Sequence, residues 1–242
     1  MKVSGAMPIN NEAEMLTYTL PHLTKAKINE LVIVLDRCFD KSLDVIEFWE
    51  RNFKPKFNIV KIQNVEYTPT TQIAKMFQKA FEHCSGDVIY SLAADCLYDN
   101  SIFNYDLDYD AICFSHLNWD LDTSKIRCSY EDILRKIRHF KQIGDVFAVK
   151  RGVWQDLGGF HMAEEKLWHP HGIEFFERLT KVGYKYAVKP SKTLHLRSYN
   201  TQFTDFRQGL LRAKLKESHL KVLLHSMLLM KPNVFKGYLH GK

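Results

Sequence analysis

The first hundred residues alternate between short apolar runs and amphipathic stretches. Residues 30–35 (ELVIVL) form a continuous apolar run of strand length, typical of a parallel strand covered on both faces. Residues 13–23 instead repeat apolar side chains at helical spacing. In chain order, the pattern predicts strands at 2–7, 30–35, 57–62 and 87–93 and helices at 13–23, 42–49 and 71–83. This alternation predicts a doubly wound α/β fold with a mostly parallel central sheet.

The second half of the chain is less regular. Apolar runs predict strands at 110–116, 145–150 and 185–188, and periodicity predicts helices at 131–141 and 172–182. Gly183 follows the last helix at its C-cap position, and Leu157-Gly158-Gly159-Phe160 predicts a turn. No repeat or linker interrupts the chain, so the simplest division is one domain over residues 1–200 and a tail over 201–242.

Charge is distributed unevenly along the 242 residues. Residues 1–206 hold 26 basic and 27 acidic side chains, whereas residues 207–242 hold eight basic and one acidic. The main body is therefore nearly neutral, which argues against nucleic acid as its partner, and the basic tail points to an anionic surface. Hydrophobic residues make up 45% of the chain, which excludes a disordered or fibrous protein.

The cysteines favour a reducing compartment. There are five, widely spaced, with no Cys-x-x-Cys pair and no zinc-finger spacing. The N-terminus (MKVSGAMPINNEAE) lacks the apolar core of a secretory signal, and no stretch reaches the roughly 18 apolar residues of a membrane span. These observations predict a cytoplasmic protein.

The residues that follow the predicted strands are the ones to examine for chemistry, because parallel sheets bind ligands beyond the carboxyl ends of their strands. Three polar segments follow strands: Pro8–Glu12, Asp36–Asp40 and Ala94–Cys96. Neither Gly-x-Gly-x-x-Gly nor a P-loop motif is present. A nucleotide at this edge would therefore need carboxylates and a metal ion rather than a glycine cradle.

Six segments, taken together and in order, resemble the family-2 glycosyltransferases of the GT-A fold. The resemblance covers about residues 2–198. The matching segments are VSGAMPINNEAE, VIVLDRCFDKS, GDVIYSLAADC, GDVFAVKRGVWQDLGGF, IEFFERLTKVGY and LHLRS. The resemblance implies a three-layer α/β/α domain that transfers a sugar, with inversion, from a nucleoside-diphosphate sugar such as a UDP- or GDP-sugar.

Carried over residue by residue, the resemblance implies a donor site and a metal site. Asp36 matches the residue that recognises the base, and Pro8 and Glu12 match the nucleoside pocket. Ala94 and Asp95 match the end of the Asp-x-Asp motif, whose last aspartate binds Mn²⁺ or Mg²⁺. His195 matches a late histidine that helps to hold the metal and the diphosphate in some relatives.

The sequence departs from the family pattern at two places. Ala93 replaces the first aspartate of Asp-x-Asp, which predicts weaker metal binding. His171-Gly172 replaces the Glu-Asp pair that supplies the family's catalytic base. Glu174 is the preferred candidate for this base and His171 the second, with Glu164 and Glu165 lying upstream.

Each candidate also has a purely structural interpretation. Asp36 and Asp40 could cap the helix that begins near Ser42, Glu174 could form an i,i+4 ion pair with Arg178, and His195 could be a structural histidine. A degenerate module that binds a nucleotide sugar or a partner without turnover is the second functional hypothesis. A nucleotidyltransferase is a weaker third, because the segment 8–12 has no basic residue for a triphosphate.

The sequence of residues 207–242 predicts a contact with a membrane surface. Residues 207–230 alternate leucines with basic side chains, which is typical of a basic amphipathic helix at a membrane interface. Pro232 is expected to end this helix, and the apolar residues 235, 238 and 239 to add a second contact. These features predict a peripheral protein on the cytosolic membrane face. For the glycosyltransferase that the resemblance implies, the expected acceptor is then a hydroxyl on a lipid-linked or surface glycan. The alternative is that the apolar face packs on the sheet or on another protomer.

Overall fold

The computed structural model describes residues 1–64, 73–120, 125–127, 146–161 and 171–196, and, in the C-terminal part, 206, 209–210, 212–213, 218–228 and 231–241. Its strands are β1 (Val3–Ile9), β2 (Glu30–Asp36), β3 (Asn58–Asn64), β4 (Val88–Ser91), β5 (Cys96–Leu97), β6 (Ala111–Asp120), β7 (Lys125–Arg127), β8 (Phe147–Lys150) and β9 (Tyr186–His195). Its helices are α1 (Ala13–Leu23), α2 (Ser42–Phe53), α3 (Ile73–Glu82), the 3-10 turn η1 (Asn100–Phe103), α5 (Arg151–Asp156), α6 (His171–Val182), α8 (His219–Leu228) and α9 (Pro232–His240).

All nine described strands join one sheet in the order β3-β2-β1-β4-β8-β6-β9-β5, with β7 paired to β6. The first four strands run parallel, as the alternating sequence pattern predicts. The prediction of a mostly parallel sheet is wrong for the other half. Strand β8 is antiparallel to both β4 and β6, and β5 and β7 are antiparallel to their neighbours, so only β6 and β9 pair in parallel there. A buried apolar strand has the same composition in either direction, so the sequence does not disclose its sense.

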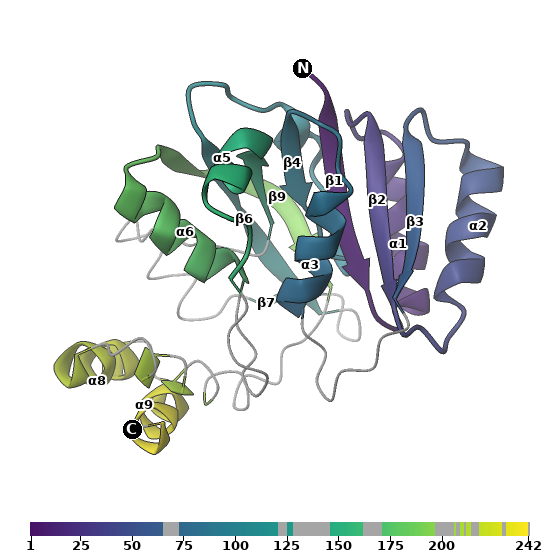
Figure 1. Ribbon diagram of the computed structural model, residues 1–242. Coiled ribbons are helices and arrows are strands. Elements are labelled where there is room, and N and C mark those ends of the chain that lie inside the picture. The colour runs from purple at the N-terminus through teal and green to yellow at the C-terminus, as the bar shows by residue number, and fades with distance from the viewer. Residues whose placement is uncertain are drawn as a thin grey trace.

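The sheet separates two hydrophobic cores, which makes three layers. Successive residues of β2 point to opposite faces. Leu31 and Ile33 pack with α1 and α2, whereas Val32 and Val34 pack with α3, α5 and α6. Figure 1 shows α3, α5 and α6 in front of the sheet, with α1 on the far side. This double coverage explains why β2 is apolar at almost every position.

An aromatic cluster in the second core fixes the turn after α5. Phe160 packs edge-on against Phe81 of α3, with ring centroids 4.8 Å apart, and against Phe175 of α6, at 5.4 Å. Phe147 of β8 contacts the same ring at 6.2 Å. Each of these rings is buried, and removing one buried phenylalanine typically costs about 3–5 kcal/mol of stability. The Gly158-Gly159-Phe160 turn is therefore anchored between α3 and α6.

Several predicted elements differ from those observed, and α2 and β6, for example, each extend four residues beyond the predicted ends at 49 and 116. The last strand was expected to stop at residue 188 but continues to His195, and this extension carries the histidine into the sheet. In the tail, Pro232 does not simply end a helix, because it opens α9 as one of its first residues, where a missing backbone N–H costs nothing. The predicted helix at 131–141 lies outside the described residues.

The helices α8 and α9 pack on each other at the C-terminus. Val222 of α8 is fully buried against Val234 and Tyr238 of α9. Among the described residues, no helix is both long and apolar enough to cross a bilayer.

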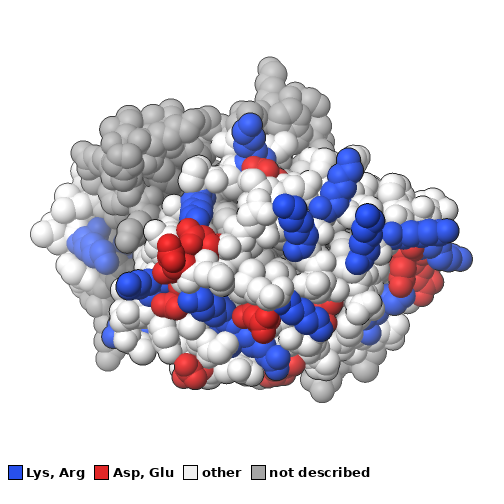
Figure 2. Space-filling view, turned by 90° about the horizontal axis from the view of Figure 1, so that it is seen from above, with Lys and Arg blue, Asp and Glu red and all other residues white. Residues whose placement is uncertain are grey.

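The molecular face nearest the start of β1 carries charges of both signs. Figure 2 views this face and shows basic side chains interleaved with acidic ones. At the same end of the sheet, Lys150 lies opposite the first residue of β4, and its Nζ is 3.1 Å from Asp110 Oδ1. The described part of this face therefore presents a mixed field rather than one of a single sign.

Candidate functional site

The ends of β2 and β3 are joined by a buried carboxylate. Asp36 is the last residue of β2 and is 2% exposed. Arg37 donates to both of its oxygens, from Nε to Oδ1 at 3.0 Å and from Nη2 to Oδ2 at 2.9 Å. Asn64, at the end of β3, donates to Oδ1 at 2.9 Å and accepts from Lys79 Nζ at 3.1 Å. The proposed base-recognition residue is thus fixed in place by two partners.

The loops after β1 and β2 are tied together by side-chain amides. Asn11 Oδ1 accepts from the backbone N–H of Phe39 at 2.7 Å, and Asn10 Nδ2 donates to the carbonyl oxygen of Asp36 at 2.5 Å. Asn11 has a φ of 55°, in the left-handed region that asparagine tolerates better than most residues. The segment 8–12 therefore has one defined position beside the end of β2.

Asp40 lies one residue before Lys41, the N-cap of α2, and binds the first residue of the helix, so the structural interpretation of this residue is confirmed in part. Its Oδ1 accepts from the Ser42 backbone N–H at 3.0 Å and from Ser42 Oγ at 2.6 Å, and its Oδ2 accepts from the Ala13 N–H at 2.8 Å. Partial burial alone would raise the pKa of Asp40, but these hydrogen bonds outweigh it and lower the pKa. The Asp36 side chain instead accepts hydrogen bonds from Arg37 and Asn64. The two aspartates therefore have different structural roles.

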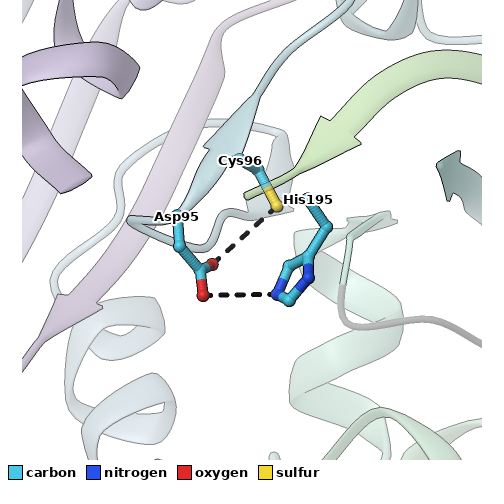
Figure 3. A group of neighbouring side chains, drawn as sticks. All are labelled: Asp95, Cys96 and His195. Atoms are coloured by element: carbon cyan, nitrogen blue, oxygen red, sulfur yellow. Dashed lines mark hydrogen bonds and ion pairs between the residues drawn. The ribbon is translucent and has the colours of Figure 1, made fainter. Parts of the chain in front are cut away.

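The predicted metal ligands Asp95 and His195 lie side by side, together with Cys96 (Figure 3). Asp95 Oδ2 is 3.2 Å from His195 Nε2, and Cys96 Sγ is 4.0 Å from Asp95 Oδ1. One ligand atom from each residue lies within 4.8 Å of the other two. Oxygen, nitrogen and sulfur atoms at these separations form a donor set that suits a divalent cation.

Strand pairing brings this group together from positions one hundred residues apart. Cys96 of β5 lies directly opposite His195 of β9, and the backbone N–H of Leu196 donates to the carbonyl oxygen of Asp95 at 2.8 Å. The preceding loop is fixed as well, because Thr19 Oγ1 donates to Ala94 O at 2.6 Å. The site thus rests on the sheet rather than on a mobile loop.

The predicted donor residues surround the same edge of the sheet. Pro8 lies near the end of β1, Glu12 immediately precedes α1, and Asp36 ends β2. In the sheet, β1 lies between β2 and β4. In the sequence, Ala94 and Asp95 come shortly after the end of β4. Two strand spacings place the ends of β2 and β4 about 10 Å apart. The fold therefore collects these five residues along one edge, as expected for a ligand site at the carboxyl ends of parallel strands.

The candidate bases lie on α6. Glu174, one turn into the helix, accepts hydrogen bonds from Arg178 on both carboxylate oxygens, and the Arg178 Nη2 to Glu174 Oε2 distance is 3.0 Å. His161 Nδ1 lies 3.6 Å from Glu174 Oε1. The i,i+4 ion pair of the structural interpretation is therefore present. His171 is the first residue of α6, and Glu164 and Glu165 lie outside the described residues.

Sequence reasoning missed two partners at this edge. Cys96 was noted as part of a strand-end segment but not as a ligand, because zinc-type cysteine spacing was absent. Only its pairing with β9 shows that it faces His195. Arg37 was missed as the partner of Asp36, although its position directly after a buried strand-end aspartate is a signal that can be read from sequence.

No protein-family model and no curated protein sequence matches the chain. Solved structures do match. The mannosyltransferase PcManGT from Pyrobaculum calidifontis, in complex with GDP-Man and Mn²⁺, superposes with a TM-score of 0.65 at 16% identity over 99% of this chain and 70% of that one. The chain therefore has a fold similar to that of this mannosyltransferase.

A second structural relative is TarS from S. aureus. Its fragment 1–349 superposes with a TM-score of 0.60 at 16% identity, over 90% of this chain and 66% of the fragment. The same fragment in complex with UDP-GlcNAc gives a TM-score of 0.62 at 14% identity, over 90% of this chain and 67% of the fragment. The chain thus spans about two thirds of the TarS fragment, and it covers 40% of the longer TarS structure.

Proposed function

We propose that the protein is an inverting GT-A glycosyltransferase that moves a sugar from a UDP- or GDP-sugar to an acceptor hydroxyl, assisted by Mn²⁺ or Mg²⁺. The observation that carries this proposal is the contact of Asp95 with His195 at the carboxyl edge of the sheet, 3.2 Å apart. The similar fold of PcManGT, which was solved with GDP-Man and Mn²⁺, supports it. So does the order of the six sequence motifs.

In this proposal Asp95 and His195 hold the metal ion. Their oxygen and nitrogen atoms are ligand types that suit Mn²⁺, and the carboxylate also suits Mg²⁺. A bound ion supplies positive charge where the departing diphosphate becomes negative. Ala93 offers no second carboxylate, which agrees with a site that binds metal weakly until the diphosphate adds its own oxygens.

The donor nucleoside lies between the ends of β1 and β2. Asp36 faces the base, with Pro8 and Glu12 on one side and Ala94 leading to the diphosphate. Each carboxylate oxygen has two lone-pair directions, so Asp36 retains acceptor capacity beyond its bonds to Arg37 and Asn64. A carboxylate fixed in this way is held ready for a donor group on the base, since little side-chain freedom remains to be lost on binding.

Glu174, with His171 as the alternative, takes the proton of the acceptor hydroxyl. The Glu174 side chain is 16% exposed, so it is open to a substrate while paired with Arg178. Deprotonation prepares the hydroxyl to attack the anomeric carbon on the side opposite the diphosphate, which inverts the configuration. Holding donor and acceptor in this line supplies much of the expected acceleration.

We place the protein on the cytosolic membrane face, with residues 207–242 as a peripheral contact and a lipid-linked or surface glycan as acceptor. Three apolar side chains of α8 support this placement, since Leu220, Leu224 and Met227 are 63%, 49% and 67% exposed. They recur at i, i+4 and i+7, and therefore form one stripe. The basic residues of the tail would add attraction to anionic lipid.

Calorimetric titration with UDP and GDP, with and without Mn²⁺, tests the donor site. We expect one nucleotide to bind only with the metal, and Asp95→Asn to weaken that binding by at least about tenfold. Asp106→Asn is the matched control. Asp106 lies in the loop after η1 and pairs with Lys189 of β9, so this substitution should leave nucleotide binding unchanged. If neither nucleotide binds the wild-type protein under any condition, the proposal fails.

A catalytically degenerate module is the second candidate function. Ala93 and His171-Gly172, which replace a metal ligand and the family's base, favour it. Metal-dependent nucleotide binding combined with neither transfer to a broad acceptor panel nor slow hydrolysis of the bound donor would establish this second function in place of the first.

A further inference from the structure

The residue beside the proposed metal ligands is a cysteine, which changes the kind of ion that the site can hold. Cys96 follows Asp95 directly and pairs with His195 across β5 and β9. Residues directly opposite in an antiparallel pair project to the same face, with Cβ atoms about 4.5–5.5 Å apart. The thiol and the imidazole are therefore neighbours by backbone register, and they stay so whichever rotamers they adopt.

One of the separations in this cluster matches that around one bound ion, and the others are wider, up to 4.8 Å. Metal bonds of about 2.0 Å to nitrogen or oxygen and about 2.3 Å to sulfur place the ligands of a tetrahedral ion roughly 3.3–3.8 Å apart. The observed distances are 3.2 Å from Asp95 Oδ2 to His195 Nε2 and 4.0 Å from Cys96 Sγ to Asp95 Oδ1. The two distances involve different carboxylate oxygens, so binding of one ion by all three residues requires side-chain rotation that draws the donor atoms together.

Burial shows which side of such a site is closed. Cys96 is 1% exposed and His195 6%, whereas the Asp95 side chain is 15% exposed. The sulfur and the imidazole are thus the buried members of the cluster drawn in Figure 3, and the carboxylate is the most exposed of the three. Three protein ligands with one open direction leave a position for a further oxygen ligand, such as one from a diphosphate.

We propose that Cys96 is the third metal ligand of this site, and that the site binds thiophilic divalent cations such as Co²⁺ and Zn²⁺ more tightly than Mn²⁺ or Mg²⁺. Thiolate and imidazole ligands select these ions, and affinity rises from Mn²⁺ to Co²⁺ at almost any site of this type. When the sulfur–metal bond forms, the thiol proton passes to solvent. The proposal rests on the proposed function in taking Asp95 and His195 as ligands.

Optical titration of the 242-residue chain with Co²⁺ alone tests the inference. Sulfur ligation gives a thiolate-to-cobalt charge-transfer band in the near ultraviolet, which oxygen and nitrogen ligands do not produce. We expect this band in the wild type and its loss in Cys96→Ala, together with a decrease in Co²⁺ affinity of at least about tenfold. Zn²⁺ should remove the band at a far lower concentration than Mg²⁺ does.

Cys84→Ala is the matched control, since Cys84 is equally buried but belongs to the core on the other face of the sheet. It should keep both the band and the affinity. A wild-type protein that binds no Co²⁺, or shows no sulfur band, overturns the proposal, as does a band that persists in Cys96→Ala.

The two proposals can fail separately. A sulfur band without any nucleotide binding refutes the transferase function and keeps the thiolate site. Nucleotide binding with Mn²⁺ but no sulfur band refutes the thiolate site and keeps the transferase function.

Discussion

Arg178 and Glu174 form an ion pair on α6 that also holds a turn on a neighbouring element. The guanidinium contacts both oxygens of Glu174, and it donates to the carbonyl oxygens of Leu157 and Gly159, the latter at 2.6 Å. Arginine suits this position because its planar fork can serve a carboxylate and two carbonyls at once. The candidate base is thus joined to the Gly-Gly-Phe turn, and its catalytic and structural roles must be separated by experiment.

Glu174→Gln should reduce turnover far more than it reduces stability. If this carboxylate takes the acceptor proton, the amide cannot, and kcat should fall by about 10²–10⁴-fold while nucleotide affinity stays unchanged. Steady-state kinetics with a working acceptor and calorimetry would measure the two effects. Glu177→Gln, an exposed change on the same helix, is the control. A variant that loses stability but keeps its kcat would leave Glu174 with a structural role only.

Arg178→Lys should weaken the attachment of α6 to the turn. Lysine keeps the charge but cannot reach Glu174, Leu157 and Gly159 together, so partly buried carbonyl groups lose their donors. We expect the free energy of unfolding in urea to fall by about 1–3 kcal/mol. Arg51→Lys on the exposed face of α2 should change it by less than about 0.5 kcal/mol. Equal effects at the two sites would contradict the importance of the Arg178 contacts.

Gly159→Ala should destabilise the protein more than Gly183→Ala. Both glycines have a positive φ, 74° at Gly159 and 94° at Gly183, so an alanine at either position introduces backbone strain. A Cβ at Gly159 would also lie 2.4 Å from Gln78 Oε1, whereas one at Gly183 meets nothing within 4 Å. Gln78 accepts from the Phe160 N–H at 2.8 Å, so displacing it breaks a second contact. Urea unfolding of the two variants side by side measures the difference, and equal losses would show that strain alone matters.

The sequence predicted the parallel half of the sheet well because β1, β2 and β4 are buried apolar strands and because a helix follows each of β1, β2 and β3. It failed on the direction of β8, because this strand is as continuously apolar as the parallel strands although it pairs antiparallel. It failed on the length of β9 because residues 189–195 (KPSKTLH) are mostly polar and carry no strand pattern. Strand pairing also limits what the sequence discloses about the candidate metal site. Motif order predicted Asp95 and His195 as ligands, but Cys96 becomes a candidate ligand only when β5 is known to pair with β9.

The engagement of Asp36 shows a second limit of sequence reasoning. An aspartate at the end of a strand predicts a contact with a ligand. The sequence does not disclose whether a neighbouring side chain already donates hydrogen bonds to the carboxylate. Here Arg37 adopts a φ of 47° and folds its guanidinium back onto the preceding side chain. A local backbone conformation, and not residue type alone, thus decides how much of Asp36 remains for a ligand.

Glu30 should make the stability of the fold depend on pH in the acid range. Its burial alone would raise the pKa, but hydrogen bonds from Ser4 Oγ at 2.5 Å and from Ser85 outweigh this effect and hold the pKa below the usual value of 4.5. A depressed carboxyl pKa stabilises the fold fully above the unfolded-state value, and this contribution is lost as the pH falls through the folded-state value. Urea unfolding between pH 6 and pH 3 should therefore show a slope that Glu30→Gln reduces. Glu47→Gln on α2 is the control, and an unchanged slope in Glu30→Gln would contradict the assignment.

The exposed stripe of α8 should decide whether the protein binds membranes. Leu220, Leu224 and Met227 point away from the buried side of the helix, where Val222 and Ser226 pack against the rest of the tail. Burial of apolar side chains in an interface contributes about 25 cal/mol per Å², and anionic lipid adds attraction for the basic side chains. We expect the 242-residue chain to sediment with anionic vesicles and less with zwitterionic ones. Changing the three stripe residues to Gln should lower the bound fraction, whereas Leu107→Gln, equally exposed in a loop of the main domain, should not. Sedimentation that is absent with both vesicle types, together with a dimer in light scattering that the stripe variant dissolves, would show that a second copy of the chain covers this face instead.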